Sequence, residues 1–425
     1  MSREMKNSGI PWIGEIPAGW QVCFIKQVMR NKSIKGFPDE QVLSLYREHG
    51  VVPKDSRDDN HNVTSEDTSG YKLVDIGDFV INKMKAWQGS MAVSDYRGII
   101  SPAYYICYFT NEDINKRYIH YLLRNESYKD EYMRLSTGLR VGQWDLNIED
   151  FLRIRMILPS LKEQQAIATI LDKKCSEIDE MISLQEKIIE ELKAYKQSVI
   201  TEAVCRGLNP NVPMKDSGIE WIGEIPEGWS IDKIVRSFEL IGSGTTPKST
   251  DDTNFEGDIY WIQSGDINGS ILTSCKNKIS NDTLERFSAL KVYDAPFIIV
   301  AMYGASVGNA CISQINGCVN QACCVLKGDR LNLNYAFNAV KACKDYLIRK
   351  AVGGGQPNIS QDTIKSSWIP VPPIAEQQSI ADYLDEKCGE IDTLIAVKQS
   401  KIGALKEYKK SIIYEYVTGK KEVPA

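Results

Sequence analysis

The chain has 425 residues, of which 43% are hydrophobic and 25% charged, and its formal net charge is −5. This composition is globular, and the length suffices for two or three hydrophobic cores. Because no apolar run reaches the length of a membrane span and the first residues lack the order of a secretory signal, we predict a cytoplasmic protein.

The first element along the chain is a turn-rich lead-in, residues 7–20, with the sequence NSGIPWIGEIPAGW. Residues 216–229 repeat it as DSGIEWIGEIPEGW. Proline and glycine at these positions interrupt helices and favour turns. We expect the four tryptophans of the two copies to pack against the globular segment that follows each; they are Trp12, Trp20, Trp221 and Trp229.

Residues 21–157 contain short apolar runs such as QVLSLY, YKLVDIGDFVIN and GIISPAYYICYF, separated by Gly and Asp. Enrichment in Val, Ile, Tyr and Phe between such breaks is typical of strands. Residues 116–134 have a helical pattern, and a polar loop with the sequence GLRVGQ follows at 138–143. This segment is therefore predicted to be a mixed α+β domain.

A long helix is predicted at residues 158–204, where apolar residues recur at helical spacing behind Pro159. We expect its buried stripe to include Leu171, Ile178, Leu192 and Val199, together with Met181, Ile188 and Tyr195 between them and Ile182 and Ile189 alongside. Residues 371–418 are a second copy, in which Glu376, Gln377 and Gln378 correspond to Glu163, Gln164 and Gln165. The duplicated stripe includes Leu384, Ile391, Leu405 and Ile412, with Leu394, Tyr408, Ile395 and Ile402.

Residues 230–370 follow the plan of the first globular segment with different letters, and residues 205–229 and 419–425 form a linker with the repeated lead-in and a tail. Two apolar helical stripes in one chain pair most economically as an antiparallel coiled coil. Both stripes contain a polar break, Gln185 in the first and Lys398 in the second, and we hypothesise that the two side chains face each other near a pseudo-twofold axis. Two solvent-exposed polar residues are the alternative.

The acidity of the chain lies in the two helical repeats. Residues 162–204 contain six Lys and nine Asp or Glu, and residues 375–417 contain six Lys and eight Asp or Glu, which leaves the remainder of the chain neutral. Because acidic stripes repel DNA, we expect them to face away from any nucleic acid or to be covered by partner proteins.

Signatures of catalysis are missing from the sequence. Pro247 replaces the second glycine of a phosphate loop in GSGTTPKST, the three histidines are isolated, and no Asn/Asp-Pro-Pro-aromatic tetrad occurs. The eleven cysteines are an odd number without CxxC spacing, so neither a disulfide framework nor a zinc site is predicted. We predict no catalytic residue and no metal ligand in this chain.

Three features together resemble the DNA-specificity subunit of type I restriction-modification systems. They are two globular segments of like plan, two long helices that open with P-x-x-x-E-Q-Q-x-I-A, and two lead-ins of the form G-I-x-W-I-G-E-I-P-x-G-W. The resemblance covers essentially the whole chain. It implies an α+β fold with two mixed α/β target recognition domains, 21–157 and 230–370, separated by an antiparallel pair of long helices in a pseudo-twofold internal repeat.

The resemblance also implies the function and the partners. Each recognition domain would bind one half of a bipartite double-stranded DNA site, and the helices would act as spacer and docking platform. Two modification subunits carrying S-adenosylmethionine would methylate adenine, and restriction subunits with ATP and Mg would translocate and cleave DNA. The chain itself would be a non-catalytic subunit.

Amide, hydroxyl and basic side chains in polar loops suit base-edge and phosphate contacts. On this ground and by similarity to the family's patterns, the candidate DNA-binding residues are Lys83, Lys85, Arg140, Gln143, Thr245, Thr246, Lys248, Gln263, Gln356 and Asn358. Simple turn chemistry is the alternative for the Gly and Pro residues around them. Two other functions stay open from the residues alone: a protein-interaction scaffold without DNA binding, and an enzyme whose site has no familiar signature.

Overall fold

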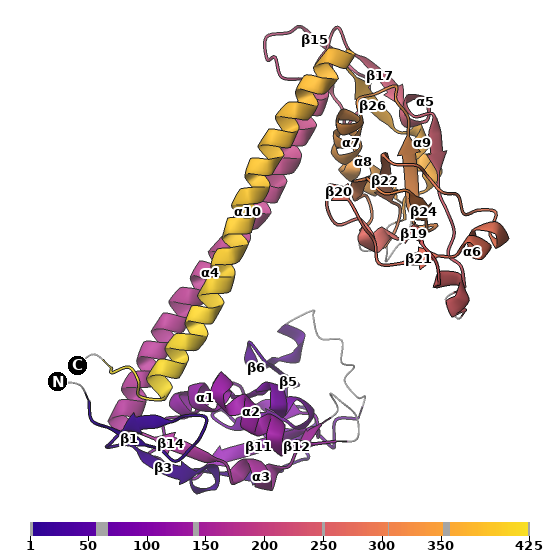
Figure 1. Ribbon diagram of the computed structural model, residues 1–425. Coiled ribbons are helices and arrows are strands. Elements are labelled where there is room, and N and C mark those ends of the chain that lie inside the picture. The colour runs from indigo at the N-terminus through magenta and orange to yellow at the C-terminus, as the bar shows by residue number, and fades with distance from the viewer. Residues whose placement is uncertain are drawn as a thin grey trace. The chain divides into compact units, whose positions relative to one another are not determined.

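The computed structural model describes residues 3–56, 67–138, 144–248, 251–304, 306–351 and 358–423. The chain divides into two compact units: unit 1 is Met1–Glu186 with Ser400–Ala425, and unit 2 is Lys187–Gln399. Each unit contains one globular domain and a segment of each long helix, α4 (Leu161–Arg206) and α10 (Ile374–Val417) (Figure 1). Neither these nor the other helices in the described part of the chain combine the length and hydropathy of a membrane span.

The domain of unit 1 is built from short strands with three helices. Its strands are β1 (Met5–Asn7), β2 (Glu15–Pro17), β3 (Gln21–Phe24), β4 (Met29–Lys32), β5 (Leu43–Tyr46), β6 (Gly50–Pro53), β7 (Lys72–Val74), β8 (Phe79–Asn82), β9 (Met91–Val93), β10 (Gly98–Ile100), β11 (Tyr104–Phe109), β12 (Ser136–Thr137), β13 (Asp145–Leu146) and β14 (Arg155–Leu158). Its helices are α1 (Lys116–Arg124), α2 (Glu126–Leu135) and α3 (Ile148–Leu152), with 3-10 turns η1 (Ile25–Gln27), η2 (Lys54–Ser56) and η3 (Lys83–Gln88).

The domain of unit 2 has the same kinds of element. Its strands are β15 (Met214–Asp216), β16 (Glu224–Pro226), β17 (Ser230–Lys233), β18 (Leu240–Gly242), β19 (Ile259–Ile262), β20 (Ile271–Leu272), β21 (Lys278–Ile279), β22 (Phe297–Ala301), β23 (Ala310–Ser313), β24 (Gly317–Val319), β25 (Cys323–Lys327) and β26 (Trp368–Val371). Its helices are α5 (Ile234–Ser237), α6 (Asn281–Arg286), α7 (Leu333–Ala342), α8 (Lys344–Arg349) and α9 (Gln361–Ser366), with η4 (Asp252–Phe255) and η5 (Ser264–Asp266).

The central sheets of the two units have matching strand orders. Unit 1 has the antiparallel sheet β4-β11-β8-β9, and unit 2 has β18-β25-β22-β23 with β20 added in parallel to β23. The pair β3 and β14 in unit 1 corresponds to β17 and β26 in unit 2, and the hairpin β1-β2 corresponds to β15-β16. The predicted α+β class with two mixed domains of like plan is therefore confirmed.

The helical stretch predicted at residues 116–134 is two helices rather than one. Asn125 separates α1 from α2, and its side-chain oxygen accepts a hydrogen bond from the backbone N–H of Ser127 at 3.0 Å, so it caps the second helix. Asparagine is favoured at such a cap because its side chain satisfies an orphan backbone donor. In unit 2 the corresponding stretch is divided into α7 and α8 at Cys343.

The lead-in tryptophans are part of the cores. Trp20 is buried in unit 1 and Trp229 in unit 2, each among the aliphatic residues that close its domain against the long helices. Trp12 packs edge-on against Tyr128, with ring centroids 6.1 Å apart, and Trp221 packs against Tyr346 at 6.4 Å. Packing against the following domain, as the sequence predicts, accounts for all four.

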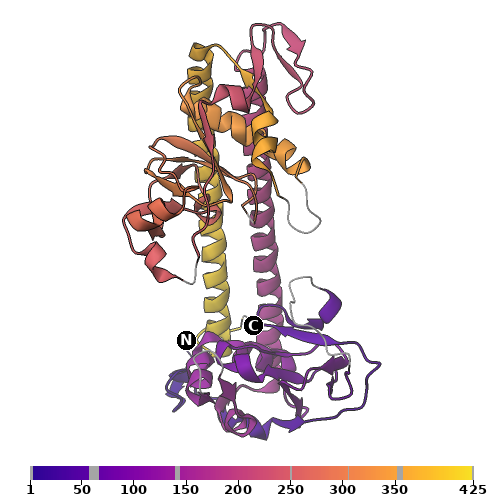
Figure 2. The same ribbon diagram turned by 90° about the vertical axis from the view of Figure 1, so that its right-hand side faces the viewer.

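Within each unit the segments of α4 and α10 lie side by side and run antiparallel (Figures 1 and 2). In unit 1 the Nζ of Lys409 contacts the carboxylate of Asp179 at 2.6 Å, and in unit 2 Lys196 contacts Asp392 at the same distance. The shift in residue number that takes Glu163 to Glu376 also takes Asp179 to Asp392 and Lys196 to Lys409. The two ion pairs, one in each unit, therefore occupy equivalent positions of the internal repeat.

The buried stripe of the long helices is narrower than the sequence pattern indicates. Ile178, Ile182 and Ile189 are buried, whereas Met181 and Tyr195 are about half exposed. The buried positions alternate at steps of three and four residues, which is the narrow seam of a paired helix. The expectation that Met181 and Tyr195, with Leu394 and Tyr408 of the second copy, belong to that seam is therefore wrong: all four are about half exposed and lie on its flank.

Candidate nucleic-acid interface

Several connecting segments of unit 1 meet at one end of the central sheet, which we call the edge of this domain. The register pairs Tyr104 with Asn82, so the start of β11 lies beside the end of β8. At the same edge the backbone N–H of Lys83 donates to the carbonyl of Ala103 at 3.2 Å, and that of Leu73 donates to the carbonyl of Ile34 at 2.8 Å. The segments that follow β4 and β8 and that precede β7 and β11 consequently meet there.

The topologically equivalent edge of unit 2 gathers the loops predicted there. Ala301 pairs with Cys323, so the end of β22 lies beside the start of β25, and Gly242 at the end of β18 pairs with Val325. The parallel strands β19 and β24 end at the same level, because Ile262 pairs with Val319. The described loops at this edge are 243–248, 263–266, 302–304, 306–309 and 320–322, together with residue 358, which bridges to Tyr303.

In unit 1 the structure places two of the four predicted DNA-binding residues at this edge. Lys83 and Lys85 belong to η3, whose start is capped by the side-chain oxygen of Asn82. The Nζ of Lys83 lies 4.6 Å from the ring centroid of Tyr105, a cation–π distance, while Lys85 is exposed. Arg140 and Gln143 lie outside the described residues; the two strands that flank them, β12 and β13, pair as a hairpin.

Two further lysines, Lys72 and Lys35, are brought to the same edge by the fold, although neither is marked by a motif. Lys72 is the first residue of β7 and its Nζ donates to the carbonyl of Tyr104 at 2.7 Å. Burial, followed by the charges of Lys83 and Lys35, lowers the pKa of Lys72. The one signal in the sequence is a lysine that opens an apolar run, and such lysines are common at strand ends, so pattern alone could not have selected it.

In unit 2 the loop 243–248 is held by its backbone carbonyls. Tyr293 donates its hydroxyl to the carbonyl of Ser243 at 2.8 Å, Trp261 donates its indole N–H to that of Thr245 at 3.2 Å, and Asn254 donates its amide to that of Lys248 at 3.1 Å. Three side chains from other segments thus hold Ser243, Thr245 and Lys248 of the loop in place. Side-chain hydrogen bonds of this kind make a loop rigid at the cost of few residues.

The glycines of this loop allow its close approach to the sheet. A Cβ on Gly244 would stand 1.7 Å from the carbonyl oxygen of Val319, and one on Gly242 would stand 2.2 Å from the hydroxyl of Tyr293. Real Cβ atoms do not approach other atoms so closely, so glycine is required at both positions. Pro247 is buried, while Thr246 and Lys248 remain exposed.

The other predicted residues of unit 2 lie around this loop. Thr246 shares a hydrogen bond with Gln321, which follows β24, and Gln263 is half-buried at the start of η5. Asn358 is exposed and bridges to Tyr303, next to the end of β22. Gln356 lies outside the described residues. The structure therefore brings Thr245, Thr246, Lys248, Gln263 and Asn358 to one edge of the domain.

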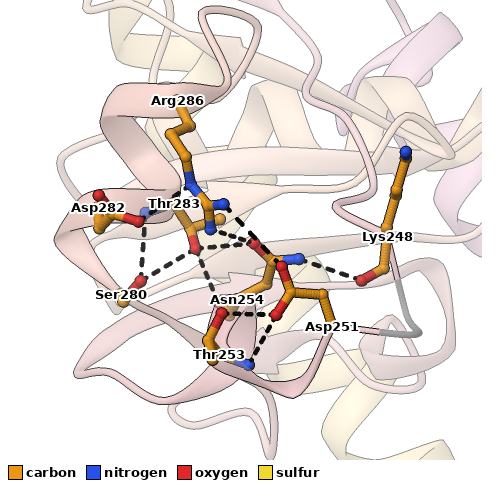
Figure 3. A network of polar contacts seen from close by, with 8 residues as sticks. All are labelled: Lys248, Asp251, Thr253, Asn254, Ser280, Asp282, Thr283 and Arg286. Carbon is orange, nitrogen blue, oxygen red and sulfur yellow. Dashed lines mark hydrogen bonds and ion pairs between the residues drawn. The ribbon is translucent and has the colours of Figure 1, made fainter.

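A network around Asn254 connects the loop to α6 (Figure 3). The side-chain oxygen of Asn254 accepts hydrogen bonds from Arg286 at 2.7 Å and from the hydroxyl of Thr283 at 3.2 Å. Arg286 also pairs with Asp282 at 3.0 Å. Asn254 and Thr283 are buried, so their polar atoms need these partners. The network holds the far end of loop 243–248 in place.

Two buried thiols of the central sheets, Cys107 and Cys324, have raised pKa values. Burial raises the pKa of the Cys107 thiol and of the Cys324 thiol to about 12, so neither ionises readily near neutral pH. Among the described residues no three His, Cys, Asp or Glu side chains are grouped as a metal site would require. The chemistry of both edges is that of hydrogen bonding and positive charge.

The predicted helix-pairing residues are distributed as follows. The buried ones are Leu171, Ile178, Gln185, Val199, Leu384, Ile391 and Ile412, and the half-buried ones are Leu192, Lys398 and Leu405. The side-chain oxygen of Gln185 has no hydrogen-bond partner among the described residues. Gln185 belongs to unit 1 and Lys398 to unit 2, so the hypothesis that they face each other stays a prediction.

Exposed apolar residues form an equivalent patch on the helices of each unit. Patch 1 is Met181, Leu184 and Tyr408 in unit 1; patch 2 is Leu394, Val397 and Tyr195 in unit 2. All six side chains are between 46% and 57% exposed, and the shift that relates the two helices takes Met181 to Leu394, Leu184 to Val397 and Tyr195 to Tyr408. Exposed apolar side chains that recur at equivalent positions are candidates for a protein interface.

An open groove lies beside the helices in each unit. In unit 1 it has about 520 Å³ and is lined by Trp12, Asn125, Glu126, Ser127, Glu407, Lys410, Ser411 and Tyr414. In unit 2 it has about 510 Å³ and is lined by Ala194, Gln197, Ser198, Thr201, Glu202, Cys205, Arg206, Ile222 and Asp345. The four α10 positions of the first groove correspond by the same shift to Ala194, Gln197, Ser198 and Thr201 of the second.

The sequence and fold were compared with known proteins. The sequence model of the family described as "Type I restriction modification DNA specificity domain" matches residues 17–194 and 226–403. The chain is 26% identical, over 96% of its length and 95% of the relative, to the MjaX specificity subunit of a type I restriction enzyme from Methanocaldococcus jannaschii. It is 25% identical to the MjaVIII specificity subunit of the same organism, over 79% of this chain and 77% of that one.

The fold is similar to that of a chain solved in a study of complex assembly and conformational transition of the type I R-M system. The TM-score is 0.69, the sequences are 16% identical, and the similarity covers 95% of this chain and 99% of the other. The two matches to the family model together span most of the chain, one in each half, in agreement with the repeated sheet orders. The chain therefore belongs to the family of type I restriction-modification DNA specificity subunits.

Proposed function

We propose that the two sheet edges are the DNA-reading surfaces, one for each half of a bipartite site. The observation that carries the proposal is the topological equivalence of the two edges: each lies where the central strands of its domain end, and each presents different side chains. A pseudo-repeated protein with two different readers would recognise two different half-sites, in the way that dimeric DNA-binding proteins recognise two identical ones.

The side chains of the two edges support different kinds of contact. Lys83 and Lys85 in unit 1 suit phosphates and guanine, while Gln263 and Asn358 in unit 2 suit the edge of adenine. The loop 243–248 is held by hydrogen bonds to its carbonyls. Lys248 is exposed there, and the hydroxyl of Thr246 donates to the side-chain oxygen of Gln321. A rigid support is what sequence-selective contacts need.

The chain is proposed to be the non-catalytic subunit of its complex. Methyl transfer to adenine would be carried out by modification subunits that bind S-adenosylmethionine, and translocation and cleavage by restriction subunits that bind ATP and Mg. Support comes from the membership of the chain in the family of DNA specificity subunits.

Two modification subunits are proposed to dock on the long helices, one for each unit. The support is the duplication of surface: patch 1 and patch 2 consist of equivalent positions, and the grooves beside them share four equivalent helical positions. Two equivalent surfaces on one chain fit two copies of the same partner. The acidic exposed faces of the helices are consistent with protein rather than DNA as the ligand.

The experiment that tests the proposal exchanges one domain. Residues 21–157 are replaced by the corresponding segment of another family member, and the intact modification system is expressed in cells whose methylated sites are then sequenced. One half of the recognised site is expected to change and the other to stay. A matched exchange of residues 230–370 should change the opposite half. Altered recognition of both halves by either exchange would contradict separate reading, and methylation without sequence preference would favour a scaffold role.

A further inference from the structure

Lys72 is a lysine that the fold buries without a carboxylate. Lys72 is 9% exposed, and its Nζ donates to the backbone carbonyl of Tyr104 at 2.7 Å. The same ammonium lies 5.7 Å from the ring centroid of Tyr105, and the ammonium of Lys83 lies 4.6 Å from that centroid. Two lysines from different segments therefore gather on one aromatic ring.

The positive charges of Lys72 and Lys83, which we call the lysine cluster, are not neutralised by ion pairs with described carboxylates. The charged groups that act on Lys72 are Lys83 and Lys35, both of the same sign, and no ion pair joins Lys72 or Lys83 to a described carboxylate. The nearest acidic influence is that of Asp145 on the hydroxyl of Tyr105. A buried ammonium without an ion-pair partner is costly, and like charges beside it raise that cost. An anion bound beside the cluster would offset this cost.

The cluster is open to a ligand on one side. Lys83 is half-buried and Lys35 and Lys85 are exposed, so the positive charge continues from the buried Lys72 to the surface of the edge. An ammonium is a point charge with three donors, of which Lys72 uses one for Tyr104. This chemistry suits a single phosphate oxygen rather than the planar edge of a base, which favours guanidinium or amide groups.

We propose that Lys72 and Lys83, gathered on the ring of Tyr105, bind one backbone phosphate of the DNA at the half-site read by unit 1. The inference rests on the proposed function, because it places a DNA phosphate at the edge of a recognition domain. The contact positions the duplex without reading its sequence, since phosphates carry no base information. Lys35 and Lys85 extend the positive surface along the strand.

The test measures the affinity of the full chain, in complex with its modification subunits, for a duplex with the recognised site and for a duplex of random sequence, between 50 and 200 mM KCl. Loss of one phosphate contact lowers the slope of log Kd against log salt by about 0.9. Because the two lysines share one phosphate, the double variant Lys72→Gln/Lys83→Gln is expected to lower the slope by roughly this amount, a change of about threefold to fourfold in the salt effect over that range, and each single variant by part of it. The ratio of specific to non-specific affinity should stay as in the unchanged protein.

The matched control is Lys116→Gln. Lys116 is an exposed lysine whose ammonium lies 5.8 Å from the ring of Phe109, at the opposite end of the same strand β11. The slope of log Kd against log salt should not change in this variant. Unchanged slopes for both Lys83→Gln and Lys72→Gln, or an equal decrease for Lys116→Gln, overturn the proposal. If the unchanged complex shows no preference for the recognised site, the proposed function fails instead, so the two failures are distinguishable. Lys83 is half-buried, so Lys83→Gln is expected to perturb the fold less than Lys72→Gln does.

Discussion

The side-chain oxygen of Gln164 accepts a hydrogen bond from the backbone N–H of Asn115 at 2.8 Å, and the side-chain oxygen of Gln377 accepts one from Asn332 at the same distance. Asn115 and Asn332 are the N-caps of α1 and α7. The first glutamine of each E-Q-Q motif therefore connects the start of a long helix to a helix of the domain before it. Gln164 connects α4 to α1, and Gln377 connects α10 to α7. The repeated motif has a structural meaning: it fixes each domain to its helix.

Replacement of this glutamine should destabilise its unit. Gln164 is buried and its amide also donates to the carbonyl of Pro159 at 3.0 Å, so Gln164→Ala leaves a buried donor and a buried acceptor without their partner. Each such loss costs about 1–3 kcal/mol. Urea denaturation should show a decrease of about 2–4 kcal/mol in the free energy of unfolding.

The matched control is the neighbouring Gln165→Ala, because Gln165 is exposed in the same motif. Its free energy of unfolding should stay within about 0.5 kcal/mol of the unchanged chain. Equal losses for the two variants would show that the hydrogen bond to Asn115 contributes nothing specific.

The network of Figure 3 predicts that Asn254→Ala impairs only one half of DNA recognition. The change removes the hydrogen bonds to the carbonyl of Lys248, to Arg286 and to Thr283, and so releases one end of loop 243–248. We expect a loss of about 1–3 kcal/mol in stability and weaker discrimination at the half-site of unit 2. Competition binding with duplexes altered in one half-site at a time provides the measurement.

Asn268→Ala serves as the comparison for Asn254→Ala, since Asn268 is exposed beyond η5. It should leave discrimination at both half-sites intact. Discrimination that Asn254→Ala lowers equally at both half-sites would argue against a local role for the network.

A charged residue introduced into one apolar patch should prevent the binding of one of the two modification subunits. Leu184→Asp places a carboxylate in patch 1 alone, and the desolvation of that charge opposes docking there. The number of modification subunits bound to each chain, measured by size-exclusion chromatography with light scattering, is expected to decrease from two to one. Val397→Asp should do the same through patch 2, and the double change should abolish binding.

Ser183→Asp adds the same charge at an exposed position of α4 next to patch 1. Two bound subunits are expected for this variant. A stoichiometry that stays at two in Leu184→Asp, or one that decreases equally in Ser183→Asp, would exclude patch 1 as the docking surface.

Lys72 predicts an unusual pH dependence of stability. Its pKa in the folded chain is below the ordinary value of 10.5, because burial and the charges of Lys83 and Lys35 disfavour the ammonium. Between the two pKa values the unfolded chain binds more protons than the folded chain, so the contribution of Lys72 to stability rises with pH in this window. Below the window the penalty for the buried charge is fully present.

The measurement compares Lys72→Met with the unchanged chain, in the absence of DNA, by urea denaturation from neutral pH to about pH 10. Removal of the buried charge should make the variant more stable at neutral pH, and the difference should shrink as the pH rises and Lys72 becomes neutral. A difference that stays constant with pH would show that the ammonium of Lys72 carries no burial penalty.

Much of the architecture follows from the sequence because local pattern determines it. The duplicated E-Q-Q segments, with apolar residues at helical spacing between a proline and a glycine, are sufficient for two long helices. Short β-branched and aromatic runs between glycines are sufficient for mixed domains. The repetition of lead-in, domain and helix predicts two halves of like plan, and the matching sheet orders of the two units confirm it.

The sequence pattern fails where neighbours from distant segments decide the outcome. Met181 and Tyr195 fit an apolar stripe by spacing, yet both lie on the flank of the seam, because the partner helix covers only a narrow face. Lys72 has no distinctive sequence context, and its role depends on Lys83, Lys35 and Tyr105, which lie far from it in the chain. Long-range register, rather than local propensity, brings these groups together.

The sequence by itself therefore determined the family, the division into halves and the helices, since these depend on repetition and periodicity along the chain. The tertiary structure alone decided which loops share an edge, which lysine is buried beside another, and which carbonyls hold loop 243–248. Most of those relationships join different segments of the chain, which the pairing of strands brings together. Spacing in the sequence does not encode such contacts directly.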